Sequence, residues 1–196
     1  PIPIIITRLS DGLMIEVNEA TLRLFGYTRE EMIGHSSLEL DMWRHAEERA
    51  KLLAQFEETG EVSDYLLEYR NKGGATGFVS LSARRFILDG EPCFLGIGKD
   101  ITPQKLAEDR LRGLIDSAMD VIVSTDENQN ITIFNHAAER VFGYRADDII
   151  GRPLDILLPT RYREKHRRHV EEFGRTGVTT RTMYQPGTSY GLRANG

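Results

Sequence analysis

The sequence is poor in cysteine, in long apolar runs and in unbalanced positive charge. Its single cysteine excludes an internal disulfide framework and suits a reducing compartment, so we expect a cytoplasmic protein. No apolar run approaches the ~20 residues that cross a bilayer, and no segment has the pattern of an export signal. The net charge of −5 argues against a nucleic-acid partner, because such a surface needs a basic patch.

Catalytic and metal-binding motifs are also missing. The sequence contains no G-x-x-x-x-G-K-[ST] loop, no G-x-S-x-G elbow and no C-x-x-C pair. His166 and His169 lie close together in sequence but lack a clear third ligand, so we expect no metal site. We therefore expect this chain to have no enzymatic activity of its own.

What the sequence does contain is an internal repeat. Residues 18–34 (NEATLRLFGYTREEMIG) recur as residues 135–151 (NHAAERVFGYRADDIIG) at an offset of 135 − 18 = 117. The same offset carries Phe56 onto Phe173. Such a period is far too long for a solenoid, so the repeat predicts two copies of one domain in tandem.

Each copy has the local signals of a strand followed by two short helices. Asn18 and Asn135 follow apolar runs and are good helix N-caps. The glycines eight residues later predict left-handed helix ends, and Thr28 with Glu31 predicts a capping box for the second helix of the first copy.

The pattern N-x-A-x-x-x-x-F-G-Y-x-x-x-[DE]-[IM]-I-G resembles the beginning of a bacterial PAS domain, a sensory module. The family's closing Asp-Ile-Thr is also present, as Asp100, Ile101 and Thr102. The resemblance implies an α+β fold of two PAS-type domains, each with a five-stranded antiparallel sheet and short helices on one face. It also implies a non-catalytic sensory and dimerisation module, which relays a signal through these three residues to an output domain. Candidate parents are a sensor histidine kinase and a diguanylate cyclase or phosphodiesterase.

The domain boundaries follow from the repeat. We expect a first domain at 1–102, a helical linker at 103–118 and a second domain at 119–196, which is incomplete at its C-terminus because it ends where the first copy turns toward its last two strands. Alternating patterns predict strands in the first domain near 2–8, 13–17, 62–70, 77–88 and 92–100, and a helix near 44–58.

Two further patterns lie in the linker and at the end of the chain. In the linker, Ala107, Leu111, Leu114 and Ala118 are spaced 4, 3 and 4, as in a coiled-coil seam. This pattern fits either a homodimer formed through the helix and PAS surfaces or a helix packed on its own domain. At the end, residues 192–196 align with residues 69–73 at an offset of 192 − 69 = 123.

Two groups of residues are candidates for ligand binding. The first group would line a small-molecule or flavin pocket in the first domain, or would equally fill an ordinary core. It consists of Trp43, Phe56, Tyr65, Leu67 and Tyr69. Cys93 alternates with apolar residues in a strand, so we expect a buried thiol and not a flavin adduct.

His166 is the candidate haem ligand of the second domain. On a helix beginning at Thr160, it shares an apolar stripe with Tyr162, His169 and Phe173. By the resemblance, its position matches the proximal haem ligand of oxygen-sensing PAS kinases, while the alternative is a structural histidine. The first copy has Arg49 at the matching position, which excludes haem by this route there.

Overall fold

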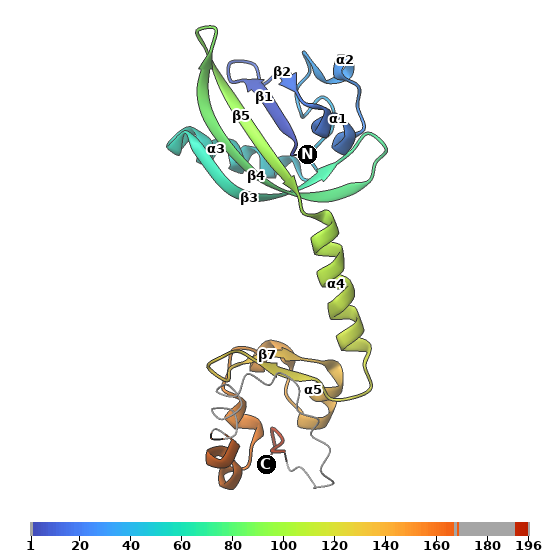
Figure 1. Cartoon of the computed structure of the whole chain (residues 1–196), viewed down its shortest axis with the longest axis vertical. Coiled ribbons are helices and arrows are strands. Elements are labelled where there is room, and N and C mark those ends of the chain that lie inside the picture. The colour runs from blue at the N-terminus through green and yellow to red at the C-terminus, as the bar shows by residue number, and fades with distance from the viewer. Residues whose placement is uncertain (1, 167, 169–190, 196) are drawn as a thin grey trace. The chain divides into compact units, whose positions relative to one another are not determined.

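The computed structural model describes residues 2–166, 168 and 191–195, in two compact units, residues 1–108 and residues 109–196 (Figure 1). We describe each unit by itself as unit 1 and unit 2. None of the helices in the described ranges has the length and apolar character needed to cross a membrane.

Unit 1 is built on a five-stranded antiparallel sheet, as predicted. The spatial order is β2-β1-β5-β4-β3. The strands are β1 (Ile4–Arg8), β2 (Met14–Val17), β3 (Glu61–Arg70), β4 (Thr76–Leu88) and β5 (Glu91–Asp100). The predicted strand boundaries differ from these by two residues at most.

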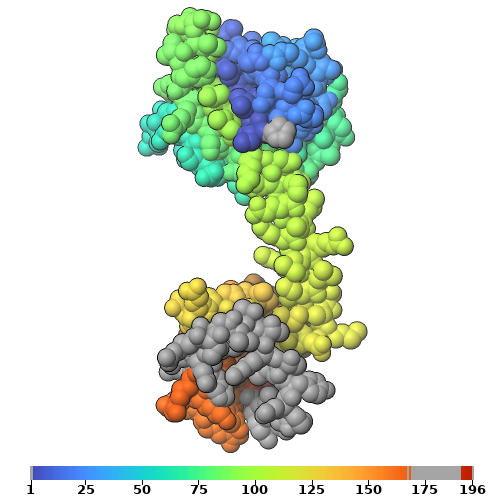
Figure 2. All heavy atoms as spheres, in the orientation of Figure 1, coloured from blue at the N-terminus to red at the C-terminus, as the bar shows by residue number. Residues whose placement is uncertain are grey.

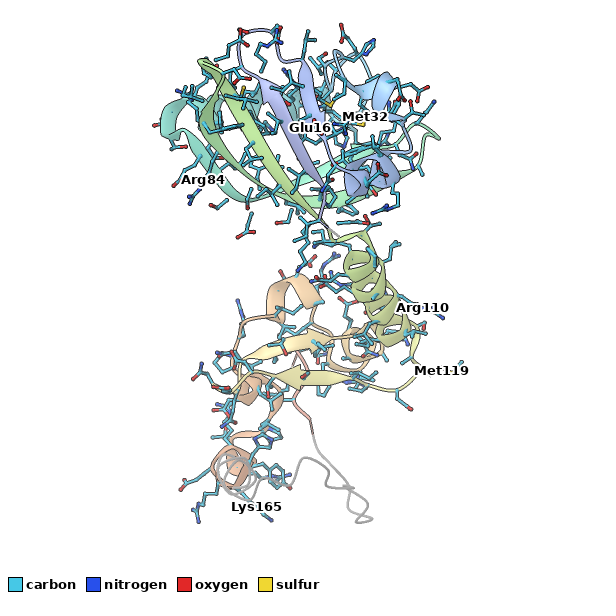
Figure 3. All side chains as sticks on the ribbon, turned by 45° about the horizontal axis from the view of Figure 1, so that its top comes forward. Glu16, Met32, Arg84, Arg110, Met119 and Lys165 are labelled. Carbon is cyan, nitrogen blue, oxygen red and sulfur yellow. The ribbon has the colours of Figure 1, made fainter. Side chains whose placement is uncertain are left out.

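Three helices complete unit 1, namely α1 (Glu19–Phe25), α2 (Arg29–Met32) and α3 (Ala46–Thr59). Phe25 and Met32 from the first two helices pack in one core cluster with Leu67 of β3. Figure 3 labels Met32. Leu52 and Phe56 of α3 form a second cluster against β3 and β4. The α+β fold predicted from the sequence is therefore present.

The predicted capping signals hold the short helices in place. Asn18 caps α1, since its side chain accepts from the backbone of Thr21, and Gly26 ends that helix in the left-handed region (φ 73°). Thr28 and Glu31 form the reciprocal capping box of α2. These local bonds fix the corner from which the site described below is built.

The described part of unit 2 repeats the order of strands and short helices seen at the beginning of unit 1, but its second short helix, α6, has no side-chain cap. Its described elements are β6 (Val123–Thr125), β7 (Ile131–Phe134), α5 (His136–Phe142), α6 (Ala146–Ile149) and the 3-10 helix η1 (Leu154–Leu157). Asn135 caps α5 as Asn18 caps α1. The backbone N–H of Gly151 donates to Ile131 (2.8 Å), as that of Gly34 does to Met14 (2.9 Å). The predicted offset of 117 is thus confirmed by the hydrogen bonds.

The predicted offset of 123 at the end of the chain is wrong by one residue. The backbone N–H of Lys72 donates to the carbonyl of Phe25 (2.9 Å), and that of Ala194 donates to the carbonyl of Phe142 (2.8 Å). The offset is therefore 194 − 72 = 122. A match over five residues could not separate the two registers, whereas a hydrogen bond to α5 does. Residues 169–190, which precede this segment, lie outside the described residues.

Helix α4 (Thr102–Ser117) begins at the end of β5, and none of its sixteen residues is buried. Figure 2 shows its side chains at the surface, and Figure 3 shows Arg110 projecting outward. Of the predicted seam, Leu111 and Leu114 are exposed on the helix. Ala118 lies one residue beyond the helix end, so the seam is shorter than predicted.

Candidate functional site

Unit 1 contains a partly open apolar cavity of about 110 Å³ between the sheet and the segment after α2. Its walls come from all five strands and from α1, and include Ile5, Met14, Phe25, Met42, Trp43, Leu67, Tyr69, Val79, Leu81 and Phe94. A dry apolar cavity of a similar size, ~150 Å³, takes up benzene or xenon. The cavity can therefore hold a small apolar molecule or an apolar part of a larger one.

The five residues predicted for a pocket separate into three groups. Trp43, Leu67 and Tyr69 line the cavity. Phe56 is fully buried in the α3 cluster and lines a neighbouring groove instead. Tyr65 is partly buried against both core clusters and lines neither hollow. The alternation along β4 and β5 could have added the missed wall residues Val79, Leu81 and Phe94.

Residues 42–44 close one side of the cavity by pairing with the end of β3. Trp43 forms an antiparallel bridge with Tyr69, and the backbone N–H of Arg70 donates to Met42 (2.9 Å). The Trp43 Nε1–H also donates to Ser37 Oγ (2.9 Å), which fixes the indole ring in the wall. The wall is therefore held by both backbone and side-chain bonds.

Tyr69 connects the cavity to the beginning of α4. Its ring meets Phe25 edge-on, with 5.3 Å between centroids. Its hydroxyl and the Thr102 side chain lie over Gly77 so closely that a Cβ there would be 2.6 Å and 2.5 Å from their oxygens. Burial raises the pKa of Tyr69, a hydrogen bond from Thr102 opposes the rise, and the charge of Asp100 adds to it. Only glycine at position 77 permits this approach.

The closing Asp-Ile-Thr ties α4 to β4. The Thr102 N–H donates to Asp100 Oδ1 (2.9 Å), so Asp100 satisfies a free amide of the first turn. The Phe78 N–H donates to Thr102 Oγ1 (2.8 Å), and the Ile101 N–H donates to the Phe78 carbonyl (2.9 Å). The three residues predicted for signal relay therefore form the attachment of α4 to the sheet.

In the described part of unit 2, a glycine stands at the position of Tyr69. Gly191 packs against the ring of Phe142, in the place where Tyr69 packs against Phe25. The corrected offset of 122 makes Gly191, and not Leu192, the equivalent of Tyr69. The aromatic side chain that joins the cavity wall to α4 in unit 1 is therefore replaced by a glycine at the equivalent described position of unit 2.

The two remaining sequence candidates are placed as follows. His166 lies in a helical segment, residues 160–166, and its Nδ1 is enclosed without a hydrogen-bond partner among the described residues. His169 and Phe173, predicted to share its stripe, lie outside the described residues. Cys93 is fully buried on β5, as predicted. Within the described ranges, no three potential metal-ligating side chains lie together.

Comparison with known proteins identifies the family. Residues 1–103 match a family model described as PAS domain, and residues 109–185 match one described as PAS fold. Because the first match covers more than half of the 196 residues, the chain belongs to the PAS domain family, with two domains in tandem. PAS domains are sensory modules of signal-transduction proteins, so the general role of the chain is sensing.

Two curated relatives are named as sensors. The oxygen sensor protein DosP of Escherichia coli K12 is 37% identical over 59 residues, which are 29% of this chain and 7% of that protein. The sensor protein FixL of Bradyrhizobium diazoefficiens is 30% identical over 88 residues, which are 41% of this chain and 17% of that protein. The chain thus spans a small part of either relative.

Among solved structures, the PAS domain of an HTR-like protein from Haloarcula marismortui is 32% identical to this chain. The match covers 52% of this chain and 82% of that one, with a TM-score of 0.44.

Proposed function

We propose that unit 1 senses a small molecule whose apolar part occupies the internal cavity. The observation that supports this is the position of Tyr69, whose ring forms part of the cavity wall while its hydroxyl meets Thr102, the first residue of α4. A ligand that displaces the ring also displaces the contact at the beginning of the helix. Ligand binding therefore shifts the equilibrium between two ways in which the beginning of α4 is attached to the sheet.

In this proposal the chain is a non-catalytic sensory and dimerisation module. It relays its signal through α4 to the output domain of a larger cytoplasmic protein, such as a histidine kinase or a diguanylate cyclase or phosphodiesterase. The sensory names of DosP and FixL support the role. The 62%, 60% and 63% exposure of Leu106, Leu111 and Leu114 supports a homodimer, since the helix of a second copy would cover these side chains.

The test uses benzene and xenon as probes of the cavity, with amide chemical shifts of the whole chain as the readout. In the wild type, we expect shifts at Leu67 and Val79 and also at Thr102. Tyr69→Phe keeps the ring in the wall but removes the hydroxyl. It should still bind the probes, while the shift at Thr102 is lost.

Tyr65→Phe is the matched control, because the Tyr65 hydroxyl lies 3.5 Å from the Glu48 carbonyl and has no contact with α4. This variant should behave as the wild type does. The sensor proposal is refuted if neither probe binds. The relay is refuted if the shift at Thr102 persists in Tyr69→Phe.

A second candidate function concerns unit 2, for which we propose haem binding through His166. The enclosed Nδ1 of His166 favours it, because a buried ring nitrogen without a partner among the described residues is costly. The His166 imidazole would hold the haem iron, and binding would remove this cost. The name of the relative DosP, an oxygen sensor, also favours it. Bound haem iron would supply a centre for a gaseous ligand.

Haem titration monitored by absorbance tests this second function. The wild type and His136→Ala should give the same Soret band, because His136 is an exposed residue that pairs with Glu139. His166→Ala should give the spectrum of unbound haem. An unchanged band in His166→Ala would exclude this residue as the ligand.

A further inference from the structure

A second hollow in unit 1, a groove of about 260 Å³, lies between the β1–β2 turn and α3. Its floor is apolar and consists mainly of Leu9, Trp43, Leu52, Phe56 and Phe94. Its rim carries Arg8, Ser10, Asp11, Arg49 and Glu57. The groove shares Thr7, Ser37, Trp43, Leu52 and Phe94 with the wall of the cavity, while its other lining residues do not line the cavity.

The two arginines of the rim differ in their ion pairs. Arg8 is paired twice, with Asp11 (2.9 Å) and with Glu91 (2.9 Å). The guanidinium of Arg49 has no hydrogen bond or ion pair with any residue that the structure describes. Its Nη2 lies next to Gly12, 3.3 Å from the position of a Cβ there. Burial lowers the pKa of Arg49, and no carboxylate compensates for this loss of solvation.

The acidic residues of the rim do not neutralise Arg49. Asp11 already accepts from Arg8 and from the backbone N–H of Leu13 (3.0 Å). Glu57 is eight residues further along α3, which places it about 12 Å away along the helix axis. A half-buried guanidinium above an apolar floor therefore keeps its full hydrogen-bonding capacity.

We propose that this groove binds a small carboxylic acid with an aromatic or short aliphatic body. Its carboxylate would accept two parallel hydrogen bonds from Arg49, a geometry that the planar guanidinium favours. Its apolar body would lie on Trp43 and Phe56. Ser37, whose oxygen accepts from Trp43, keeps its own proton for a further bond. This site goes beyond the sensing function proposed above and does not depend on it.

The test is calorimetric titration of the whole chain with hexanoate and benzoate, with hexanamide as a neutral analogue of matched size. We expect the wild type to bind the acids at millimolar concentration and to bind hexanamide more weakly. Arg49→Gln should weaken hexanoate binding about ten- to hundredfold, the range for losing hydrogen bonds to a charged group. Its hexanamide binding should not change.

Two variants serve as controls. Arg49→Lys keeps the charge but not the planar pair of donors, so it should retain part of the affinity. Arg85→Gln should bind as the wild type does, because Arg85 lies over the Phe56 ring (5.7 Å to the centroid) but does not line the groove. The proposal is overturned if the wild type binds neither acid, if hexanamide binds as tightly as hexanoate, or if Arg49→Gln retains the affinity while its tryptophan fluorescence shows a folded unit 1.

Discussion

We expect Asn135→Ala to destabilise unit 2 far more than an ordinary cap mutation would. Asn135 is 0% exposed, and its Oδ1 accepts from the backbone N–H groups of Ile122 (2.9 Å) and Ala138 (3.0 Å). Its Nδ2 donates to the carbonyls of Ile115 (3.0 Å) and Asp120 (2.9 Å). At about 1 kcal/mol net for each bond, the loss is about 4 kcal/mol. That is a large part of a typical stability of about 5–15 kcal/mol.

The equivalent change in unit 1, Asn18→Ala, should cost less. The Asn18 Oδ1 also accepts from a strand amide, that of Ile4 (3.1 Å), and from the amide and the hydroxyl of Thr21 (both 3.0 Å). Its Nδ2 donates to the carbonyl of Ile2 (2.8 Å) at an exposed position, where water replaces a lost bond. However, Thr21 Oγ1 accepts from the same Ile4 amide (3.0 Å), which therefore keeps a partner after the mutation. Unit 2 has Ala138 at this position and no such hydroxyl. We expect Asn18→Ala to cost about 0.5–2 kcal/mol, as for an ordinary N-cap.

The assay must separate the two units. Trp43 is the sole tryptophan of the chain, so its fluorescence during urea unfolding reports on unit 1. Hydrogen exchange of peptides from residues 109–166, measured by mass spectrometry, reports on unit 2. Each variant should affect its own unit, and the loss in unit 2 should be the larger. If Asn135→Ala costs no more than Asn18→Ala, counting hydrogen bonds in this way is wrong.

Three further changes test other parts of the structure. Gly77→Ala should cost about 1–3 kcal/mol in urea unfolding, as overpacking does, because the methyl would lie 2.5–2.6 Å from two side chains. Its control is Gly113→Ala, where nothing lies within 4 Å, and equal effects of the two would contradict the reasoning. Leu114→Glu should convert a dimer to a monomer in sedimentation velocity, and a dimer that persists would exclude this surface of α4. A hydrogen bond from the Ala146 amide lowers the pKa of Glu139 in the folded protein. The ionised carboxylate therefore stabilises unit 2 at a pH above its unfolded pKa, and this stabilisation is lost as the pH falls through the lower pKa of the folded state. Glu139→Gln should therefore flatten the acid limb of the stability profile of unit 2, and parallel profiles for variant and wild type would refute this.

The sequence by itself determined the local structure and the repeat. The caps at Asn18 and Asn135, the left-handed ends at Gly26 and Gly143 and the capping box at Thr28 all depend on bonds within a few residues. The strands of unit 1 follow from alternation, which needs no knowledge of the partner strand. The offset of 117 required only that two similar segments be compared.

The tertiary structure decided which buried residues form the site, because buried positions that look alike in sequence pack in different clusters. Phe56 and Tyr69 are both buried, but only Tyr69 lines the internal cavity. Its contact with Thr102, 33 residues away (102 − 69), depends on how β3 and β4 pair across Gly77. The unpaired state of Arg49 likewise depends on where the acidic residues of other elements lie. Contacts of this kind are set by long-range packing, and no periodicity in the sequence records them.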